Sequence, residues 1–272
     1  MRIVRFESGG SVQWGQLDGG AIVPCTGSIA EGFQAVPGAA AVALADVRLL
    51  APVVPGKIVA VGPNYRAHLG GRPAPARPFL WIKPSSSVAN PGDTIVLPDH
   101  DPGTPYNHES EVAIVVGRTA RAVSPEAAPA YIFGYTCIND VTGGDMTDRA
   151  AFRVSAAFVD GKIHDTFAPL GPAISTDFDP ADARIICRVN GVTRQDHRTS
   201  DMIWSCAELL SRISHVMTLH PGDVIATGSP PGQQPMKDGD VVEIEIPWIG
   251  VLRNPVVDAA TGRGANGQGV GV

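Results

Sequence analysis

Short apolar runs separated by turn residues follow one another along most of the chain. After KIVAVG, which begins at Lys57, the strand-like runs are FLWIKP, TIVLP, EVAIVVG, IFGYTCIND, RIICRVNG, DVIATG and DVVEIEIP. Short runs that are rich in Val and Ile and bounded by Gly, Pro, Asn or Asp are typical of β-strands. The pattern therefore predicts a strand-dominated α+β fold.

The sequence predicts a smaller unit in the first part of the chain. Its runs IVRF, SVQWGQL and GGAIVPC are separated by Gly pairs, which predicts two or three short strands joined by tight turns. The Pro- and Gly-containing segment APVVPGK then indicates a linker. We predict a small N-terminal β domain over residues 1–52 and a catalytic domain over residues 57–256. Residues 257–272 are predicted to form a flexible tail, because their many glycines offer too little apolar area to offset the entropy of ordering.

One segment, SDMIWSCAELLSRISHVM, has helical periodicity. A Ser or Thr near its start can cap the first turn. Its apolar residues share one face at helical spacing; they are Ile203, Ala207, Leu210, Ile213 and Met217. This segment therefore predicts a helix whose apolar stripe packs in the core.

Composition narrows the classes of function. Apolar residues make up 44% of the chain and charged residues 18%, which is typical of a globular protein. The net charge of −6 and the lack of a dense Lys/Arg run argue against nucleic acid as a partner. No stretch has the length of a signal peptide or a membrane span, so we expect a cytoplasmic protein without membrane contact. The 4 cysteines lie singly, without CxxC spacing, and are expected to be buried, reduced thiols.

Two acidic residues, Glu109 and Glu111, stand at the start of the run EVAIVVG. Alternate residues of a strand project from the same face, so both carboxylates would converge on one point. The two carboxylates repel each other unless a cation or solvent offsets their charge, and hard divalent cations such as Mg²⁺ and Mn²⁺ prefer carboxylate oxygens. Asp140, at the end of IFGYTCIND, is placed to supply a third ligand, with Asp145 and Asp148 as weaker candidates nearby.

A second acidic pair, Glu243 and Glu245 in DVVEIEIP, has the same spacing on an equally regular strand. Acids that share one face of a strand commonly form a solvated surface. Spacing alone therefore leaves both pairs open as metal sites.

Eight segments of the chain share content and order with one protein family. They are KIVAVGPNYRAHL, FLWIKPSSS, HESEVAIVVG, FGYTCINDVT, DTFAPLGP, VNGVTRQDHRTSDMIWSCAELL, MTLHPGDVIATGSPPG and MKDGDVVEIEIPWIGVLRNPV. In these segments the chain resembles the fumarylacetoacetate hydrolase (FAH) family, of the type that includes acylpyruvate hydrolases and 2-hydroxyhepta-2,4-diene-1,7-dioate isomerases. The resemblance implies an FAH-type mixed β-sandwich roll behind the small N-terminal β domain. It also implies a homodimer, as is common among relatives.

The resemblance selects one of the two acidic pairs. The family's ligands for Mg²⁺ or Mn²⁺ fall here on Glu109, Glu111 and Asp140, so Glu243 and Glu245 become structural charges. Family members act on acylpyruvates or related 2-oxo dicarboxylates, which implies a small anionic 2-oxo acid as substrate. A Lewis acid beside such a substrate can assist hydrolysis, isomerisation or decarboxylation.

Three further positions match substrate-binding parts of the family. Lys162, in GKIHDTFAPLGP, matches a lysine that lies beside the metal and contacts substrate oxygens. Thr227 and Gly228, in ATGSPPG, match a loop whose hydroxyl and backbone N–H groups bind the substrate carboxylate. The resemblance thus implies Lys162 as a catalytic and substrate-binding residue, and Thr227 and Gly228 as substrate-binding residues.

His68 matches the histidine of the family's NYxxHxxE segment, which lies on a lid and activates water together with the glutamate. Gly71 stands where that glutamate is expected, so the dyad is incomplete and hydrolysis should be weakened. The stretch GGRPAPARP that follows is rich in Gly and Pro. It carries Arg72 and Arg77 as candidate contacts for a distal carboxylate of the substrate.

A second departure from the family follows Asp140. The family usually reads NDVSARDxQ where this chain reads NDVTGGDMT, with Gly144 in place of Arg and Thr147 in place of Gln. We therefore expect a metal-dependent enzyme that acts on a pyruvoyl-type 2-oxo acid of open identity. The alternative is a pseudoenzyme that binds metal and ligand but has lost turnover. Among the other histidines, His164 stays open between a site role and a structural one, and the rest, including His108, are expected to be structural.

Overall fold

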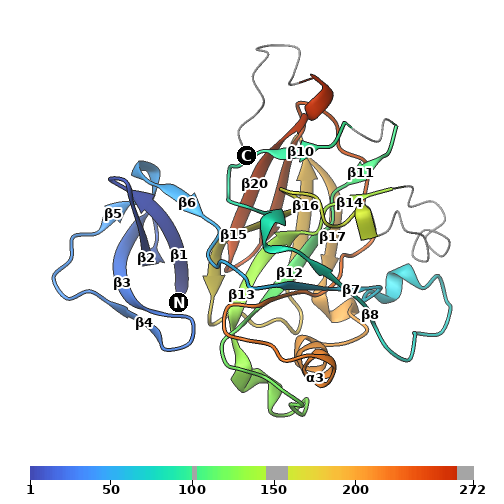
Figure 1. The fold of residues 1–272 in the computed structure, drawn as a ribbon, viewed down its shortest axis with the longest axis horizontal. Helices are drawn as coiled ribbons and strands as arrows, with labels where there is room; N and C mark the ends of the chain where they lie inside the picture. Colours follow the sequence, from blue (N-terminus) through green and yellow to red (C-terminus); the bar gives the residue numbers. More distant parts are fainter. Residues whose placement is uncertain (100–102, 145–158, 262–272) are drawn as a thin grey trace.

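Strands dominate the regular structure of the protein. The computed structural model describes residues 1–99, 103–144 and 159–261, and Figure 1 shows a small lobe of strands beside a larger body of curled sheets. The predicted strand-dominated α+β fold with an N-terminal β unit is confirmed. Within the described residues, no helix has both the length and the apolar character needed to cross a membrane.

The N-terminal lobe is built from short antiparallel strands. They are β1 (Arg2–Ser8), β2 (Ser11–Asp18), β3 (Ala21–Ser28), β4 (Gly32–Ala35), β5 (Val42–Ala43) and β6 (Arg48–Leu50). Gly9 and Gly10 both have positive φ and form the tight turn between β1 and β2. The lobe has more strands than the two or three predicted, because segments too short to show a pattern also pair with β1 and β3.

The large sheet runs through the body and into the N-terminal lobe. Its strands in the body are β7 (Ile58–Gly62), β8 (Phe79–Lys83), β12 (Ser110–Val116), β13 (Ile132–Asn139), β15 (Ala168–Ser175) and β18 (Val224–Ala226). They follow the order β1-β15-β13-β12-β18-β7-β8, in which β7 and β18 are parallel and the other neighbours antiparallel. The sheet is therefore mixed, as predicted, and β12 is a central strand with every residue buried.

A second sheet packs against the first. Its order is β10-β20-β19-β16-β17, with bounds β10 (Ile95–Leu97), β16 (Arg184–Val189), β17 (Val192–Arg198), β19 (Val241–Ile246) and β20 (Gly250–Asp258). Alternate residues of β19 share one core cluster with alternate residues of β12. Glu243 and Glu245 point the other way and pair with Arg253 at 3.5 Å and Arg188 at 2.7 Å. The second acidic pair is thus a set of structural charges, as expected.

The predicted helix is present but shorter than the pattern indicated. Helix α3 (Cys206–Val216) begins after Ser205, whose side chain accepts from the Glu208 N–H while Glu208 caps Ser205 in return. The chain before it forms a separate 3-10 turn, η5 (Thr199–Asp201), so the helix prediction was wrong for Ile203. The apolar stripe is confirmed as core packing.

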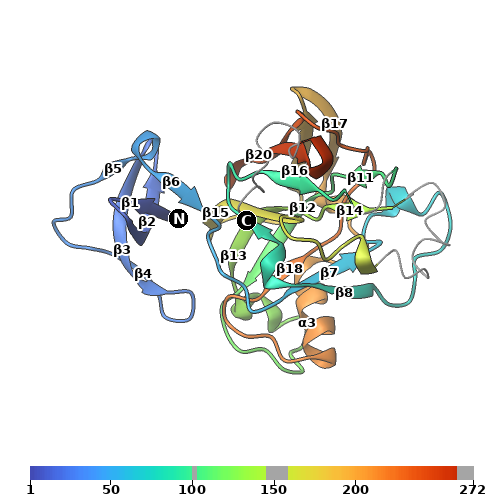
Figure 2. The same cartoon turned by 45° about the horizontal axis from the view of Figure 1, so that its top comes forward.

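Short elements complete the body. They are β9 (Val88–Ala89), β11 (Tyr106–Asn107), β14 (Thr142–Gly143) and the 3-10 turns η1 (Leu44–Asp46), η2 (Arg66–His68), η3 (Ser85–Ser87) and η4 (Ala128–Tyr131). β11 pairs with β14, one just before β12 and the other just after β13. This two-stranded ladder lies next to the start of β12 and the end of β13, where the candidate site is found (Figure 2).

The first residues of the predicted C-terminal tail belong to a strand. Residues 257 and 258 belong to β20, where Val257 pairs with Val96 and the Asp258 N–H donates to Asp238 Oδ1 at 2.9 Å. The tail prediction was therefore wrong for these two residues, because pairing with β10 orders them. Residues 262–272 lie outside the described residues.

The cysteines are free, as predicted from their spacing. Cys137, Cys187 and Cys206 are buried, whereas Cys25 is only half-buried. Burial raises the pKa of Cys187 and of Cys206 to about 12. These two thiols therefore stay protonated and act as small apolar side chains.

Candidate metal centre and substrate site

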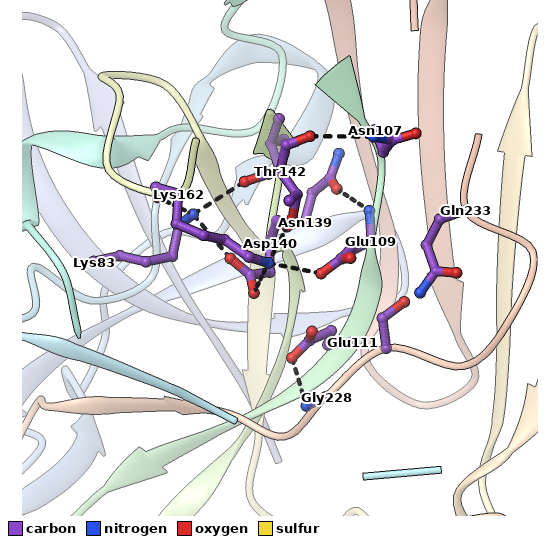
Figure 3. A network of polar contacts seen from close by, with 12 residues as sticks. Lys83, Asn107, Glu109, Glu111, Asn139, Asp140, Thr142, Lys162, Gly228 and Gln233 are labelled. Atoms are coloured by element: carbon purple, nitrogen blue, oxygen red, sulfur yellow. Dashed lines mark hydrogen bonds and ion pairs between the residues drawn. The ribbon is translucent and has the colours of Figure 1, made fainter. Parts of the chain in front are cut away.

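The three predicted metal ligands meet at the ends of two neighbouring strands. Glu109 directly precedes β12, Glu111 lies within it, and Asp140 directly follows β13. The N–H of Asp140 donates to the carbonyl of Glu109 at 2.9 Å, which extends the β12–β13 ladder. All three side chains are buried, and one carboxylate oxygen from each lies within 4.8 Å of the others. Figure 3 shows these carboxylates converging on one place.

The backbone between the two glutamates is held firmly. The Glu109 N–H donates to Asn139 Oδ1 at 2.9 Å. Ser110 lies on the opposite face of the strand, where its Oγ donates to Gln195 Oε1 at 2.9 Å. These contacts fix the register of β12, so that the alternate acids share one face as the sequence predicted.

The predicted lysine, Lys162, bridges two of the acids. Its Nζ lies 2.8 Å from Glu109 Oε2 and 2.7 Å from Asp140 Oδ2. The same ammonium group lies 4.7 Å from the centre of the Trp81 ring, so it also makes a cation–π contact. The structure therefore brings Lys162 to the three acids, where the resemblance placed it.

A second buried lysine, Lys83, was missed by the sequence reasoning. It ends β8, is fully buried, and places Nζ 2.8 Å from Asp140 Oδ1. It also donates to the carbonyl of Val141 at 3.2 Å and to the carbonyl of Lys162. A signal was present, because a lysine directly after the apolar residues of FLWIK lies on the same strand face as Trp81 and needs a buried partner.

The charges in this cluster are unequally compensated. Burial, followed by the charges of Asp140 and Glu109, raises the pKa of Glu111 well above its ordinary range. Burial also disfavours the charge of Asp140, but Lys162 and Lys83 outweigh it and lower the Asp140 pKa. Burial opposes the charge of Lys162, yet the two carboxylates that it touches raise its pKa, whereas burial dominates at Lys83 and lowers that pKa. Glu111 is therefore the acid whose charge the protein compensates least.

This donor set fits a divalent cation. Three buried carboxylates face two buried lysines, which pair with Asp140 and Glu109, so that Glu111 is the acid without an ion pair to either lysine. Carboxylate oxygens are the ligands that Mg²⁺ and Mn²⁺ prefer, and a dication would offset the mutual repulsion of the acids. The three acids could therefore hold a metal ion, with two ammonium groups next to it.

The predicted substrate loop lies against the metal centre. The Gly228 N–H donates to Glu111 Oε2 at 2.7 Å, and Gly228 has φ of +99° with Asn64 close to where a Cβ would stand. The Thr227 hydroxyl donates to the carbonyl of Val112 at 2.8 Å. Both residues are therefore beside the acids, and their contacts in this structure are with β12. Their contact with substrate stays a prediction.

The predicted lid residues lie outside the acid cluster. His68, in η2, is half-buried, and its Nε2 lies 2.9 Å from the Ser229 carbonyl and 3.5 Å from Gln233 Nε2. Gly71 is exposed, has φ of +80°, and a Cβ there would meet no atom within 4 Å. Arg72 is exposed and its Nε donates to the Leu69 carbonyl at 3.0 Å. The structure thus joins His68 to the loop after Gly228 and does not bring Arg72 to the acids.

The other candidates are placed as follows. His108 is buried and its Nδ1 lies 3.2 Å from Gln195 Oε1, while burial lowers its pKa to about 4, so it is a neutral structural residue as expected. His164 packs edge-on against Tyr106 and Phe167. Gly144 pairs with the backbone near β11, where its N–H donates to the Pro105 carbonyl at 2.9 Å. Asp145, Thr147 and Asp148 lie outside the described residues, and Arg77 is exposed.

Solved structures and curated relatives share this architecture. A 5-carboxymethyl-2-hydroxymuconate delta-isomerase from Mycobacterium smegmatis matches with a TM-score of 0.84 and 40% identity, over 95% of this chain and 100% of that chain. A maleylpyruvate hydrolase from Sphingobium sp. SYK-6, solved with manganese (II) ion and pyruvate, matches with a TM-score of 0.78 and 34% identity, over 95% of this chain and 99% of that one. The human mitochondrial oxaloacetate tautomerase FAHD2B is 38% identical over 78% of this chain and 70% of its own length.

Family models agree with these matches. The N-terminal lobe, residues 1–52, matches the domain described as Rv2993c-like, N-terminal. Residues 57–257, which include the acids and both lysines, match the domain described as fumarylacetoacetate (FAA) hydrolase C-terminal. Enzymes of this family bind a divalent metal and include both hydrolases and isomerases. The chain, which carries the buried acidic cluster in that matched domain, belongs to the fumarylacetoacetate hydrolase family.

Proposed function

We propose that the chain is a divalent-metal-dependent enzyme that moves a proton within a pyruvoyl-type 2-oxo acid, by isomerisation or tautomerisation. The observation that carries this proposal is the buried cluster of Glu109, Glu111 and Asp140 with Lys162 and Lys83. An isomerase and an oxaloacetate tautomerase among the similar proteins support the same class of reaction. A 2-oxo acid offers the oxygens and the negative charge that such a cluster recognises.

Each residue of the cluster has a part in this proposal. Glu109, Glu111 and Asp140 hold Mg²⁺ or Mn²⁺, which when bound supplies the Lewis acidity that stabilises an enolate. Lys162 presents positive charge to the substrate oxygens, and its contacts with two of the acids fix the position of its ammonium group. Lys83 holds Asp140 from the other side, so the lysines keep the cluster in place before substrate arrives.

The lid side argues against hydrolysis as the main reaction. In a hydrolytic dyad a carboxylate orients the histidine and stabilises its charged form. Here Gly71 brings no side chain, and the described contact of His68 Nε2 at 2.9 Å is with the neutral carbonyl of Ser229. A carbonyl can orient an imidazole, but it adds no full negative charge to make the ring a stronger base. A shift of a proton on the substrate needs no activated water and is compatible with this arrangement.

The proposal is tested by turnover. The protein is loaded with Mg²⁺ or Mn²⁺ and mixed with enol oxaloacetate, acylpyruvates and enol dicarboxylates, while the ultraviolet absorbance of the enol is followed and the products are identified. We expect metal-dependent conversion between tautomers or isomers that is lost in Lys162→Met. Cleavage to pyruvate and a second acid as the dominant product would contradict the proposal.

A second candidate is a ligand-binding pseudoenzyme of the same fold. Gly71 and Gly144, which stand where the family has Glu and Arg, favour it because both remove functional side chains from the substrate side. It predicts tight metal and oxalate binding without turnover of any 2-oxo acid. Any metal-dependent turnover that disappears in Lys162→Met excludes it.

We also propose that the chain forms a homodimer. β8 ends the strand order of the large sheet, and its residues Phe79 and Ile82 are 44% and 42% exposed. An apolar edge strand favours pairing with a second chain. Light scattering on the eluting protein measures the mass, and a monomer at all concentrations would contradict this expectation.

A further inference from the structure

A buried glutamine lies between the second sheet and the loop beside the acids. Of the 7 residues of β17, only Gln195 is buried, with 1% of its surface exposed. Buried positions on strands usually carry apolar side chains, and glutamine is mostly found at the surface. A buried amide is costly unless its oxygen and its NH₂ group are both hydrogen-bonded, so the partners of Gln195 indicate its role.

The oxygen of the Gln195 amide holds the strand of the metal ligands. It accepts from the Ser110 N–H at 3.2 Å and from the Ser110 hydroxyl at 2.9 Å. His108 Nδ1 lies 3.2 Å from the same oxygen. Ser110 stands between Glu109 and Glu111 and projects from the opposite face of β12. The amide oxygen is therefore fixed to the side of β12 that faces away from the acids.

The nitrogen of the same amide holds the loop that follows β18. Nε2 donates to Ser229 Oγ at 2.9 Å and to the Pro230 carbonyl at 2.6 Å. A carbonyl only accepts and a backbone N–H only donates, so Pro230 and Ser110 together determine which way the amide is turned. Both hydrogens of Nε2 are thus used to bind the loop.

The middle of this loop depends on a side chain from outside it. Pro230 and Pro231 have no N–H group, so neither can donate a backbone hydrogen bond to a neighbouring strand. The next residue, Gly232, has φ of +108°, and a Cβ there would stand 2.3 Å from the Arg194 carbonyl and 3.1 Å from Gln195 Cγ. The loop therefore packs directly on β17, and Gln195 supplies donors where the prolines have none.

The position of the loop matters for the site because of the residues at its start. The Gly228 N–H donates to Glu111 Oε2 at 2.7 Å, one residue before Ser229. Thr227 and Gly228 are also the residues for which we predict contact with substrate. Through Ser110 and Ser229, Gln195 thus links the strand of the metal ligands with the substrate loop.

We propose that Gln195 is a positioning residue, which fixes the loop of residues 227–232 relative to the three acids so that a ligand of the metal can bind. This inference rests on the proposed function, because it assumes that Thr227 and Gly228 contact that ligand. Without Gln195 the loop takes up several positions, and the affinity for ligand falls with the fraction of molecules that have the loop correctly placed. Metal binding should change less, because the β12–β13 ladder still holds the acids.

Two variants and a control separate the loop from the rest of the protein. Gln195→Met keeps a side chain of similar length and removes all of its hydrogen bonds. Ser229→Ala is milder, because it removes one acceptor of Nε2 and leaves the Pro230 carbonyl. Ser214→Ala is the matched control, since it deletes a fully buried hydroxyl of α3 that accepts from the Val123 N–H at 2.9 Å.

Two measurements are made on each protein. Hydrogen exchange followed by mass spectrometry compares peptides that contain residues 227–236 with peptides that contain residues 110–116, in the metal-free protein. Calorimetry gives the Kd of Mn²⁺ and then the Kd of oxalate on the Mn²⁺-loaded protein. A purely structural glutamine would lower overall stability and so speed exchange in both peptides alike.

We expect Gln195→Met to speed exchange in residues 227–236 by about tenfold more than in residues 110–116. It should weaken oxalate by about tenfold and Mn²⁺ by less than about threefold. Ser229→Ala should show the same pattern with effects of about threefold on the loop and on oxalate. Ser214→Ala should not favour either peptide and should leave the Kd of oxalate unchanged.

The outcomes that contradict the inference differ from those that contradict the proposed function. Equal acceleration of both peptides in Gln195→Met, or an unchanged Kd for oxalate, would overturn the positioning role and leave the proposed function intact. If Gln195→Met does not fold, Ser229→Ala decides, and unchanged loop exchange in that variant would overturn the role. If the wild-type protein binds no oxalate in the presence of Mn²⁺, the proposed function fails and this inference fails with it.

Discussion

The metal side and the lid side of the site are built in opposite ways. On the metal side, the three acids and Lys83 come from strands or their ends, and Lys162 comes from a turn. All five residues are buried, and ion pairs of 2.7 to 2.8 Å join the lysines to Asp140 and Glu109. The lid side starts at the short turn η2 and continues into an exposed stretch rich in Gly and Pro, which contains Gly71 and Arg72. His68, through Ser229 and Gln233, links the lid to the loop beside the acids.

This difference separates two tasks. A buried cluster whose members fix one another can hold a cation and a 2-oxo acid in one geometry, because little reorganisation is needed on binding. An exposed turn with few contacts costs little to rearrange, and sequence changes there are tolerated more easily. We therefore expect changes on the metal side to have large effects on stability and turnover, and changes on the lid side to act mainly on substrate preference.

The largest effect is expected from Asp140→Ala. Asp140 is the partner of both buried lysines, and removing one member of a buried ion cluster leaves uncompensated charge. We expect the free energy of unfolding to fall by about 3–5 kcal/mol, together with loss of metal binding. Urea unfolding with a chelator present measures the first effect and Mn²⁺ calorimetry the second.

Glu111→Gln is the matched control for that experiment. Because the pKa of Glu111 is raised well above its ordinary range, a neutral amide resembles the protonated acid, and its oxygen can still accept from the Gly228 N–H. This variant should lose metal binding but keep its metal-free stability within about 1 kcal/mol. Equal destabilisation by Asp140→Ala and Glu111→Gln would show that uncompensated charge on the lysines does not cause the loss of stability.

Lys162→Met is expected to lower turnover in addition to stability, because it also leaves Glu109 without its ammonium partner. It removes the donor that we propose for the substrate oxygens, and loss of one such donor commonly lowers kcat by about 100-fold or more. Lys57→Met is a control because Lys57 pairs with Asp223, another lysine–aspartate contact that includes no metal-side residue. Steady-state kinetics on both variants measure the difference, and a similar fall in kcat for both would contradict a specific role of Lys162.

The pH dependence of metal binding should follow Glu111. Its pKa is raised in the folded protein, so a cation must displace a proton and binding tightens as pH rises, by up to about tenfold per pH unit below that pKa. In the metal-free protein, a rise in pH has an unfavourable effect on folding stability, because Glu111 holds more protons in the folded state than in the unfolded state. That contribution lowers stability as pH rises from the unfolded pKa to the folded one. The melting temperatures with and without Mn²⁺ should therefore move apart as pH rises from roughly 5.5 to 8. In Glu111→Gln this separation should not appear.

The same contrast explains what the sequence could predict. The strand pattern located β7, β12, β13, β16 and β19, because each combines buried Val or Ile with clear turn signals. It did not reveal β15, whose APLGPAIS contains two prolines and a glycine that ordinarily argue against a central strand. β15 accommodates them where its pairing with β13 shifts register.

The sequence likewise predicted more of the metal side than of the lid side. Alternation on a strand placed Glu109 and Glu111 on one face, but only the family resemblance chose them over Glu243 and Glu245. Lys83 was missed because burial of a lysine depends on a partner from another part of the chain. No local pattern could show that Ser229 and Gln233 meet His68, since these contacts span more than a hundred and fifty residues.

The smallest effects are expected at Gly71, where the lid lacks the family's glutamate. A Cβ at this position would meet open space, so a side chain is disfavoured only by φ of +80°, at about 1 kcal/mol for Ala and less for Asn, which tolerates this region. Gly71→Glu should carry the same backbone cost, so the new carboxylate is not automatically placed against His68, which Ser229 already holds. We expect acylpyruvate hydrolysis to rise less than about tenfold in Gly71→Glu, against Gly71→Asn as a control for the backbone. A rise of several hundredfold would mean that the missing glutamate alone limits hydrolysis, and that the other residues of the lid already support this reaction.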